Sequence, residues 1–332
     1  MNNKEILHLE NVRKYFPVEK TFIEKLLTRK RRYVRAVDGV SFSVRKGEIF
    51  TLAGETGCGK TTTGRLILRL IEPTSGRILY DSEDISKLQG EKLKKFRREV
   101  QPIFQDPYAS LNPRMKIGDA VKHPLEIHGI VNEREAKTMV LELLAKVGLT
   151  PPEKFYNLYP RDLSGGQRQR VAIARAMILR PKLIVADEPV SMIDVSLKAS
   201  ILKLMLEFKK ELGLTYVFIT HELAVAKYIS DRIAIMYLGK IVELGNTKDV
   251  LSEPLHPYSK ALLAAVPIPN PERRGREIPI KGEVPVSPID IPPGCRFHPR
   301  CLYATDICRT EEPELKEINK GHYVACHLYD QS

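Results

Sequence analysis

The eight residues from Gly54 to Thr61 constrain the fold of this 332-residue chain more than any other feature. They fit the pattern G-x-x-x-x-G-K-[ST], in which a glycine-rich turn wraps its backbone N–H groups around phosphate oxygens. An apolar run over residues 48–53 predicts a buried strand before the loop, and residues 61–70 predict a helix after it. Strand, loop and helix N-terminus in this order predict a nucleotide-phosphate site.

The side chains of this loop have separate predicted tasks. Lys60 is expected to reach the β- and γ-phosphates of ATP, and the Thr61 hydroxyl is expected to ligate Mg²⁺. Cys58 needs no role there beyond its small size. The residues expected to contact the nucleotide in this loop are Gly54, Glu55, Thr56, Gly57, Cys58, Gly59, Lys60, Thr61 and Thr62.

A second phosphate nest lies further along the chain. Leu163-Ser164-Gly165-Gly166-Gln167 precedes a helix-like run, so a Ser hydroxyl and glycine N–H groups meet at a helix start. Taken with the phosphate loop, this sequence resembles the signature of the ABC-type ATPases. The resemblance implies that a chain with one phosphate loop uses its signature nest on nucleotide held by another subunit. The nest residues are Ser164, Gly165, Gly166 and Gln167.

Two carboxylates end a predicted buried strand at residues 183–187. Asp187 suits Mg²⁺, a hard cation that prefers oxygen ligands, and Glu188 can polarise the attacking water. The resemblance assigns three further residues by their motifs. Gln105 matches the Q-loop, which contacts Mg²⁺ or water and senses the membrane partner; His221 matches the switch histidine at the γ-phosphate; Asp194 matches the D-loop.

An aromatic side chain is expected to stack on adenine, because the π-face of its ring can pack against any flat base. Tyr15, after a strand-like start at residues 6–10, resembles the family's stacking aromatic. Tyr33 is the competitor and lies nearer the phosphate loop. We favour Tyr15, which makes residues 21–34 an insertion.

Four of the five cysteines lie in the tail, at Cys295, Cys301, Cys308 and Cys326, with the spacing C-x5-C-x6-C-x17-C. Four thiolates can bind a [4Fe–4S] cluster or tetrahedral Zn²⁺, although the paired C-x2-C spacing typical of structural zinc is absent. Disulfides would be unusual in the reducing compartment that an ATP-using enzyme occupies. The spacing alone leaves a metal site and unligated thiols equally open.

The tail also resembles one group within the family. Residues 253–263, 292–301 and 312–315 are similar to C-terminal elements of oligopeptide and dipeptide importer ATPases, a group that includes nickel and some oligosaccharide importers. This resemblance implies a [4Fe–4S] cluster on the four tail cysteines, with zinc as the alternative. It also implies a heterodimer with a paralogous ATPase subunit, although a homodimer is possible in isolation. Two membrane permease subunits and an extracytoplasmic solute-binding protein complete the system.

The predicted fold class is α/β: the P-loop fold of the ABC-type ATPases, with a RecA-like core, a helical subdomain and a small cysteine-containing extension. Residues 4–265 form the predicted ATPase domain, and its helical subdomain covers about 106–178. Residues 266–332 are expected to form a proline-rich linker followed by the cysteine-containing C-terminal domain.

Composition and charge bear on location and partners. No run approaches the roughly 18 apolar residues of a membrane helix, and no signal-like N-terminus is visible. The membrane pore would therefore have to come from other subunits, and the resemblance to importer ATPases implies a peripheral protein at the cytoplasmic face of the membrane. The net charge of +12 fits a surface beside anionic lipid headgroups, and no nucleic acid is expected as a partner, because no aromatic-rich RNA platform accompanies the charge.

Three functions compete at this stage. The favoured one is ATP hydrolysis at a dimer interface that drives uptake of oligopeptides or dipeptides through membrane permeases, with oligosaccharides or nickel as alternative solutes. A soluble ABC ATPase acting on nucleic acid or ribosomes would have two cassettes or a long coiled coil, and the sequence has neither. An iron–sulfur redox or sensing module would instead make the tail the main functional part.

Overall fold

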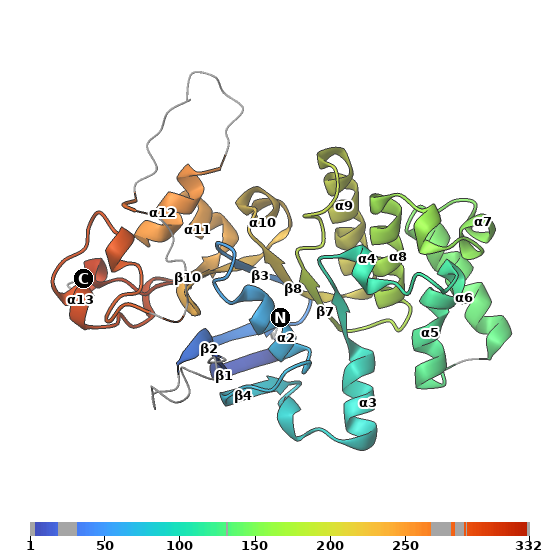
Figure 1. Ribbon diagram of the computed structural model, residues 1–332, viewed down its shortest axis with the longest axis horizontal. Helices are drawn as coiled ribbons and strands as arrows, with labels where there is room; N and C mark the ends of the chain where they lie inside the picture. The colour runs from blue at the N-terminus through green and yellow to red at the C-terminus, as the bar shows by residue number, and fades with distance from the viewer. Residues whose placement is uncertain are drawn as a thin grey trace, which may run out of the picture. The chain divides into compact units, whose positions relative to one another are not determined.

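The computed structural model describes residues 4–18, 32–130, 132–266, 280–282, 289 and 291–330 (Figure 1). Most of the predicted insertion and of the predicted linker falls outside these residues. The chain divides into two compact units, each described by itself. The first holds Met1–Lys4, Arg45–Glu48 and Lys87–Phe218; the second holds Glu5–Val44, Ile49–Ser86 and Ile219–Ser332.

The second unit contains a four-stranded sheet in the order β2-β1-β4-β5. Its long strands alternate buried and exposed side chains, as expected for a sheet with one covered face. β1 pairs antiparallel with β4, with Leu7 opposite Tyr80 and Leu9 opposite Ile78. The strands are β1 (Glu5–Pro17), β2 (Tyr33–Arg45), β4 (Ser75–Tyr80) and β5 (Glu83–Asp84).

The other strands of this unit extend from one side of a fully buried strand, β3 (Ile49–Ala53), in which every residue is apolar except Thr51. β3 pairs in parallel with β9, and β9 continues through a turn at Gly239 into β10. β10 pairs with β12, and β12 pairs with β11. These strands are β9 (Arg232–Tyr237), β10 (Lys240–Asn246), β11 (Lys316–Asn319) and β12 (His322–Val324).

Short helices complete the second unit and bring the tail into its core. Phe297, Cys295 and Cys308 of the tail are buried in one apolar cluster with Tyr237 and Tyr258. The cysteine-containing segment is therefore packed into the same core as β9. The helices are α2 (Lys60–Ile67), α10 (Leu223–Ile229), α11 (Thr247–Ser252), α12 (Pro257–Ala264) and α13 (Ile307–Thr310), with short 3-10 turns at Ile85–Lys87, His298–Arg300 and His327–Tyr329.

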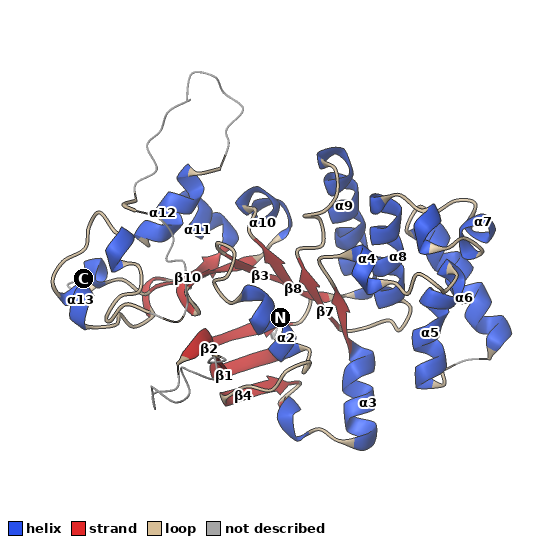
Figure 2. Cartoon of the chain, viewed as in Figure 1, coloured by secondary structure: helices blue, strands red, loops and turns tan. Residues whose placement is uncertain are grey.

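The first unit is mainly helical, as the blue ribbons of its part in Figure 2 show. Two parallel strands, β6 and β7, pair from Val100 opposite Leu183 to Ile103 opposite Ala186. The elements are α3 (Gly90–Glu99), β6 (Val100–Ile103), α4 (Pro107–Ser110), α5 (Ile117–His128), α6 (Glu133–Lys146), α7 (Pro152–Tyr156), a 3-10 turn (Pro160–Asp162), α8 (Gly165–Met177), β7 (Leu183–Asp187), α9 (Val195–Leu212) and most of β8 (Thr215–Thr220).

The α/β fold class is confirmed by this mixture of parallel strands and helices and by the solved structures compared below. The described part of the chain contains no helix that is both long enough and apolar enough to span a bilayer.

Candidate functional site

Two glycines give the phosphate loop its shape because their neighbours leave no room for a side chain. Gly54 has φ +148°, and a Cβ there would lie 2.3 Å from the Met236 carbonyl oxygen. Gly59 has φ +107°, and a Cβ there would lie 2.2 Å from the Ala36 carbonyl oxygen. Gly59 is also the N-cap of α2, so the loop leads directly into a helix start. The predicted strand, loop and helix N-terminus are all present.

Lys60 lies across this loop with its side chain buried. Its ammonium donates to the carbonyl oxygens of Gly54 at 2.8 Å and Glu55 at 2.9 Å. These contacts hold the Lys60 charge within the loop that the sequence predicts for phosphates. Burial raises the pKa of the neighbouring Cys58 thiol despite the Lys60 charge, so Cys58 stays neutral, in keeping with a role set by its size.

The two candidate adenine partners differ in their surroundings. The Tyr15 hydroxyl donates to Asp38 at 2.5 Å, and the Arg35 guanidinium lies 5.7 Å from the ring centroid. Tyr33 begins β2 and is 39% exposed. Burial opposes ionisation of Asp38, but hydrogen bonds from Tyr15 and Arg296 outweigh it and lower the pKa of this carboxyl. Tyr15 is thus anchored at its hydroxyl to an ionised group.

The end of β7 brings together two of the predicted catalytic residues. Asp187 is the last residue of the strand, and Glu188 follows with φ +46°, a backbone conformation that only a few per cent of non-glycine residues adopt. The Gln105 amide donates to the Glu188 carboxylate at 3.0 Å. Backbone strain of this kind concentrates at functional sites, where it aims a side chain.

The signature segment forms a capped helix start. The Ser164 hydroxyl accepts from the Gln167 N–H at 3.3 Å, and the Gln167 side chain accepts from the Ser164 N–H at 2.9 Å, which makes a capping box for α8. A Cβ on Gly166 would lie 2.7 Å from Leu197 Cδ1, whereas a Cβ on Gly165 would meet no heavy atom of the described chain within 4 Å. The glycines therefore leave the helix start accessible at Gly165.

The remaining predicted residues lie at element ends. His221 directly follows β8, and Asp194 is the N-cap residue of α9; both are exposed. The predicted ATP-site residues divide between the two units. The first unit holds Gln105, Ser164, Gly165, Gly166, Gln167, Asp187, Glu188 and Asp194, and the second holds Tyr15, the loop residues 54–62 and His221.

The four tail cysteines lie in one neighbourhood but do not form a metal-binding arrangement. Burial raises the pKa of Cys326 to about 12, and the other three tail thiols add to this shift. The Cys295 N–H donates to the Cys308 carbonyl at 2.9 Å. The donor set has the chemistry of an iron–sulfur or zinc site. Within the described ranges, however, no three His, Cys, Asp or Glu side chains are grouped closely enough to hold a metal ion.

Two tail residues that touch the phosphate loop were missed by sequence reasoning. The Arg300 guanidinium contacts the Glu55 carboxylate with two hydrogen bonds of 3.0 and 3.2 Å. The Tyr258 hydroxyl accepts from the Glu55 N–H at 2.9 Å. Both belong to tail segments that resemble peptide-importer ATPases, and that resemblance was the one signal pointing to them. It supplied no role, because contacts between residues this far apart leave no local pattern.

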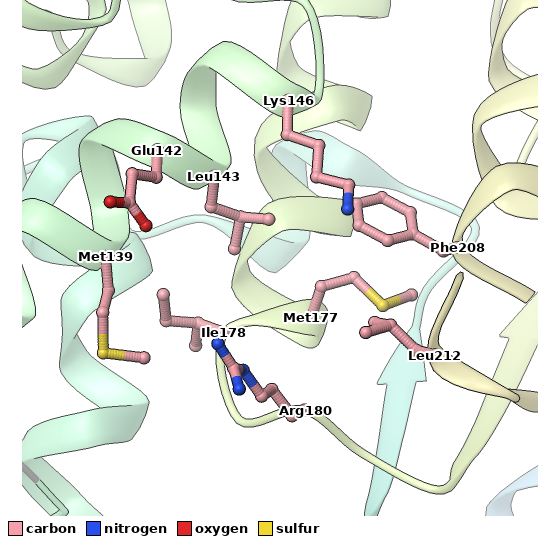
Figure 3. Close-up of a pocket in the computed structure, with 9 residues that line it drawn as sticks. All are labelled: Met139, Glu142, Leu143, Lys146, Met177, Ile178, Arg180, Phe208 and Leu212. Atoms are coloured by element: carbon pink, nitrogen blue, oxygen red, sulfur yellow. The ribbon is translucent and has the colours of Figure 1, made fainter.

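A pocket of about 300 Å³ lies elsewhere in the first unit, between α6, the end of α8 and α9 (Figure 3). Its floor is apolar, and Glu142, Lys146 and Arg180 bring charges to it. The Lys146 ammonium lies 5.1 Å from the Phe208 ring centroid. No predicted ATP-site residue lines this pocket.

The chain matches two protein-family models and is similar to proteins of known family. The ABC transporter model matches residues 37–191, and the model of the oligopeptide/dipeptide transporter C-terminal region matches residues 242–308. The chain is 50% identical to the oligopeptide transport ATP-binding protein AppF of Bacillus subtilis (strain 168), over 99% of this chain and 98% of the relative. It is 44% identical to the dipeptide transport ATP-binding protein DppF of Haemophilus influenzae, over 99% of this chain and 98% of that relative.

Solved structures give the same fold. The dimeric structure of a post-hydrolysis state of the ATP-binding cassette MJ0796, bound to ADP and Pi, is 31% identical, with a TM-score of 0.63. It covers 73% of this chain and 99% of that one. The structure of cbiO1 from Clostridium perfringens, part of the transporter complex cbiONQ, is 27% identical with a TM-score of 0.62, over 75% of this chain and 91% of that one.

Proposed function

Because the chain belongs to the ABC transporter family, in the group of oligopeptide and dipeptide transport ATP-binding proteins, we propose that it is the ATP-hydrolysing subunit of a peptide importer. The observation that carries this proposal is the match over nearly the whole chain, tail included, to relatives named for oligopeptide and dipeptide transport. The phosphate loop with its buried Lys60 supports ATP as the energy source.

Within the ATP site, the residues have distinct proposed roles. Lys60 neutralises the β- and γ-phosphates, and Thr61 and Asp187 hold Mg²⁺. Glu188 polarises the attacking water, because its carboxylate stands at a strand end with Gln105 hydrogen-bonded to it. His221 contacts the γ-phosphate, and the remaining loop residues, Tyr15 and Asp194 complete the nucleotide contacts. Phosphoryl transfer needs mainly positioning and charge stabilisation, which this set supplies.

The signature segment supports a second ATPase subunit as a partner, and the family supports the other proposed partners. The start of α8 at Ser164 and Gly165 is a phosphate nest that we assign to ATP bound by a second subunit. We propose a heterodimer with a paralogous ATPase, seated on two permease subunits at the cytoplasmic face of the membrane and fed by an extracytoplasmic solute-binding protein. ATP clamps the two subunits together, and hydrolysis releases them.

Uptake in cells tests the solute class. A strain lacking this chain is complemented with the wild-type chain or with the Lys60→Ala variant, and uptake of a labelled oligopeptide, a dipeptide, an oligosaccharide and Ni²⁺ is measured. We expect the wild-type chain alone to restore peptide uptake. Restoration of only Ni²⁺ or oligosaccharide uptake would assign the chain to those solutes instead.

For the tail, we propose that the four cysteines ligate one [4Fe–4S] cluster, with zinc as the alternative. Support comes from the donor chemistry of four thiols in one neighbourhood, whereas the placement of the side chains does not by itself make a metal site. Such a cluster would bind the tail segments to one another. Anaerobically purified protein is expected to contain about four iron and four sulfide per chain, as this cluster type requires. Stoichiometric zinc, or no metal at all, would contradict the proposal.

A matched set of variants assigns the ligands. Cys→Ser at any of the four tail positions, Cys295, Cys301, Cys308 or Cys326, is expected to remove the iron. Cys58→Ser is the control, because Cys58 lies in the phosphate loop beside Lys60, and it should keep the iron.

A further inference from the structure

The segment between the first two tail cysteines reaches the nucleotide site. Arg300 is buried, with 5% of its side chain exposed, and its two terminal nitrogens bond to the two carboxylate oxygens of Glu55, at 3.0 and 3.2 Å. A bidentate arginine–carboxylate pair fixes both partners in one orientation, which a single hydrogen bond does not. Glu55 is the second residue of the phosphate loop, so the tail holds this loop directly.

Glu55 is held at its backbone as well. Its N–H donates to the Tyr258 hydroxyl at 2.9 Å, and its carbonyl accepts from the Lys60 ammonium at 2.9 Å. Arg300, Tyr258 and Lys60 therefore fix the side chain, the N–H and the carbonyl of Glu55. A loop that is ordered before its ligand arrives loses less entropy on binding.

A second tail arginine reaches the predicted adenine end. Arg296 has 5% of its side chain exposed and pairs with Asp38, and it also donates to the Leu238 carbonyl. The other carboxylate oxygen of Asp38 accepts from the Tyr15 hydroxyl at 2.5 Å. Arg296 therefore orients Tyr15 through one shared carboxylate, whose ionised form this arginine also stabilises.

The two arginines stand on one rigid support. Phe297, between them in sequence, is 1% exposed and packs edge-on against Tyr237, with ring centroids 5.3 Å apart, and against Tyr258 at 5.4 Å. The Arg300 guanidinium lies 5.8 Å from the ring centroids of both Phe297 and Tyr237. Because close-packed cores transmit displacement, a shift of this segment would move both arginines together.

We infer that Arg300 and Arg296 are positioning residues of the ATP site: Arg300 sets the phosphate loop through Glu55, and Arg296 sets the adenine-stacking ring of Tyr15 through Asp38. The second half rests on the proposed role of Tyr15, and the first half does not. The tail is thereby part of the nucleotide-binding apparatus, with each arginine serving a different moiety of ATP.

Two probes separate these roles on the full chain. MgATP reports on both ends of the site, whereas inorganic tripolyphosphate with Mg²⁺ reports on the phosphate loop alone. By calorimetric titration, Arg300→Met is expected to weaken binding of both probes about tenfold, within the usual range for coupled sites. Arg296→Met is expected to weaken MgATP by about the same factor and to leave tripolyphosphate binding unchanged. Arg300→Lys keeps the charge but cannot form the bidentate pair with Glu55, so it should bind both probes more tightly than Arg300→Met and more weakly than the wild-type chain.

A control addresses loss of folding. Phe297→Leu loosens the same support while keeping both arginines, and its melting temperature is compared with those of the arginine variants. The positioning roles are overturned if Arg300→Met, Arg296→Met and Phe297→Leu all weaken binding of the two probes equally. The loss of affinity would then follow the loss of thermal stability. Unchanged binding of both probes in Arg300→Met overturns the role of Arg300, and unchanged MgATP binding in Arg296→Met overturns that of Arg296. If Tyr15→Leu leaves MgATP affinity unchanged, the adenine assignment fails, and the Arg300 half is decided by its own result.

Discussion

At the scale of single residues, the main prediction about catalysis concerns Glu188. Its backbone has φ +46°, and its carboxylate accepts a hydrogen bond from Gln105 just past the end of β7. Glu188→Gln keeps the shape of the side chain and removes the charge that we propose polarises the attacking water. We expect turnover to fall by about 100-fold or more, the contribution of a positioned base, while MgATP binding is kept. Steady-state ATPase assays and nucleotide titration measure the two effects.

Lys60→Ala is the matched comparison for Glu188→Gln, because it removes the proposed phosphate contact and should weaken MgATP binding itself. Near-normal turnover in the Glu188→Gln protein would contradict the assignment. The motif residues around both positions were predictable, since loop, strand end and signature each carry a local pattern. The positive φ of Glu188 was not, because no sequence pattern marks a strained non-glycine residue.

At the scale of elements, the start of α12 gives a prediction about pH. The His256 ring nitrogen accepts from the Tyr258 N–H at 3.0 Å, which requires an unprotonated nitrogen. Burial lowers the pKa of His256 to about 4, although the Glu243 charge partly opposes the shift. The unfolded chain, with the ordinary value of 6.5, therefore binds the proton first as pH falls. The free energy of unfolding should decline by about 3 kcal/mol between these two values.

His256→Asn tests this origin of the pH dependence. Asparagine can still accept the hydrogen bond at a helix start, but it does not titrate. Urea unfolding across the same pH range should give a flatter dependence for the variant than for the wild-type chain. Equal slopes in the two proteins would rule out His256 as the source.

Element boundaries followed from the sequence where the pattern was local. β8 coincides with a local run of β-branched and aromatic residues from Thr215 to Thr220, and Gly148, with φ +78°, stands just past the end of α6, where glycine commonly ends a helix. β1 was predicted to cover residues 6–10 but extends to Pro17, and its pairing with the distant β4 runs past the predicted end as far as Arg13. The helix after the phosphate loop ends at Ile67 and not at Leu70, since Arg69 has φ +52°.

At the scale of the whole molecule, the role of the tail was the least predictable part. Arg300 and Glu55 are 245 residues apart, and neither their pairing nor that of Arg296 with Asp38 has any signature in local periodicity. The aromatic cluster around Phe297 brings them together only when the chain folds. In the sequence, the cysteines are the conspicuous feature of the tail. In the structure, the tail contacts the phosphate loop and Asp38 through Arg300 and Arg296, which lie between the first two of these cysteines.

The dimer prediction belongs to the same scale. Ser164 and Gly165 open a helix start that we assign to a partner's γ-phosphate, so MgATP should bridge two subunits when hydrolysis is blocked. Size-exclusion chromatography with light scattering is run on the Glu188→Gln chain, alone and mixed with its paralogous subunit. We expect a dimer with MgATP and a monomer without it. An absence of ATP-dependent association with either partner would contradict the shared site.

A variant of the signature sharpens this measurement. Aspartate caps a helix as well as serine does, so Ser164→Asp should keep the start of α8 intact. Its carboxylate would face the partner's phosphate, however, and like charges brought together in a closed site repel strongly. In the Glu188→Gln background, we expect Ser164→Asp to keep each chain's own MgATP affinity and to abolish the dimer between two such chains. A dimer that persists in this double variant would place the partner's phosphate away from Ser164.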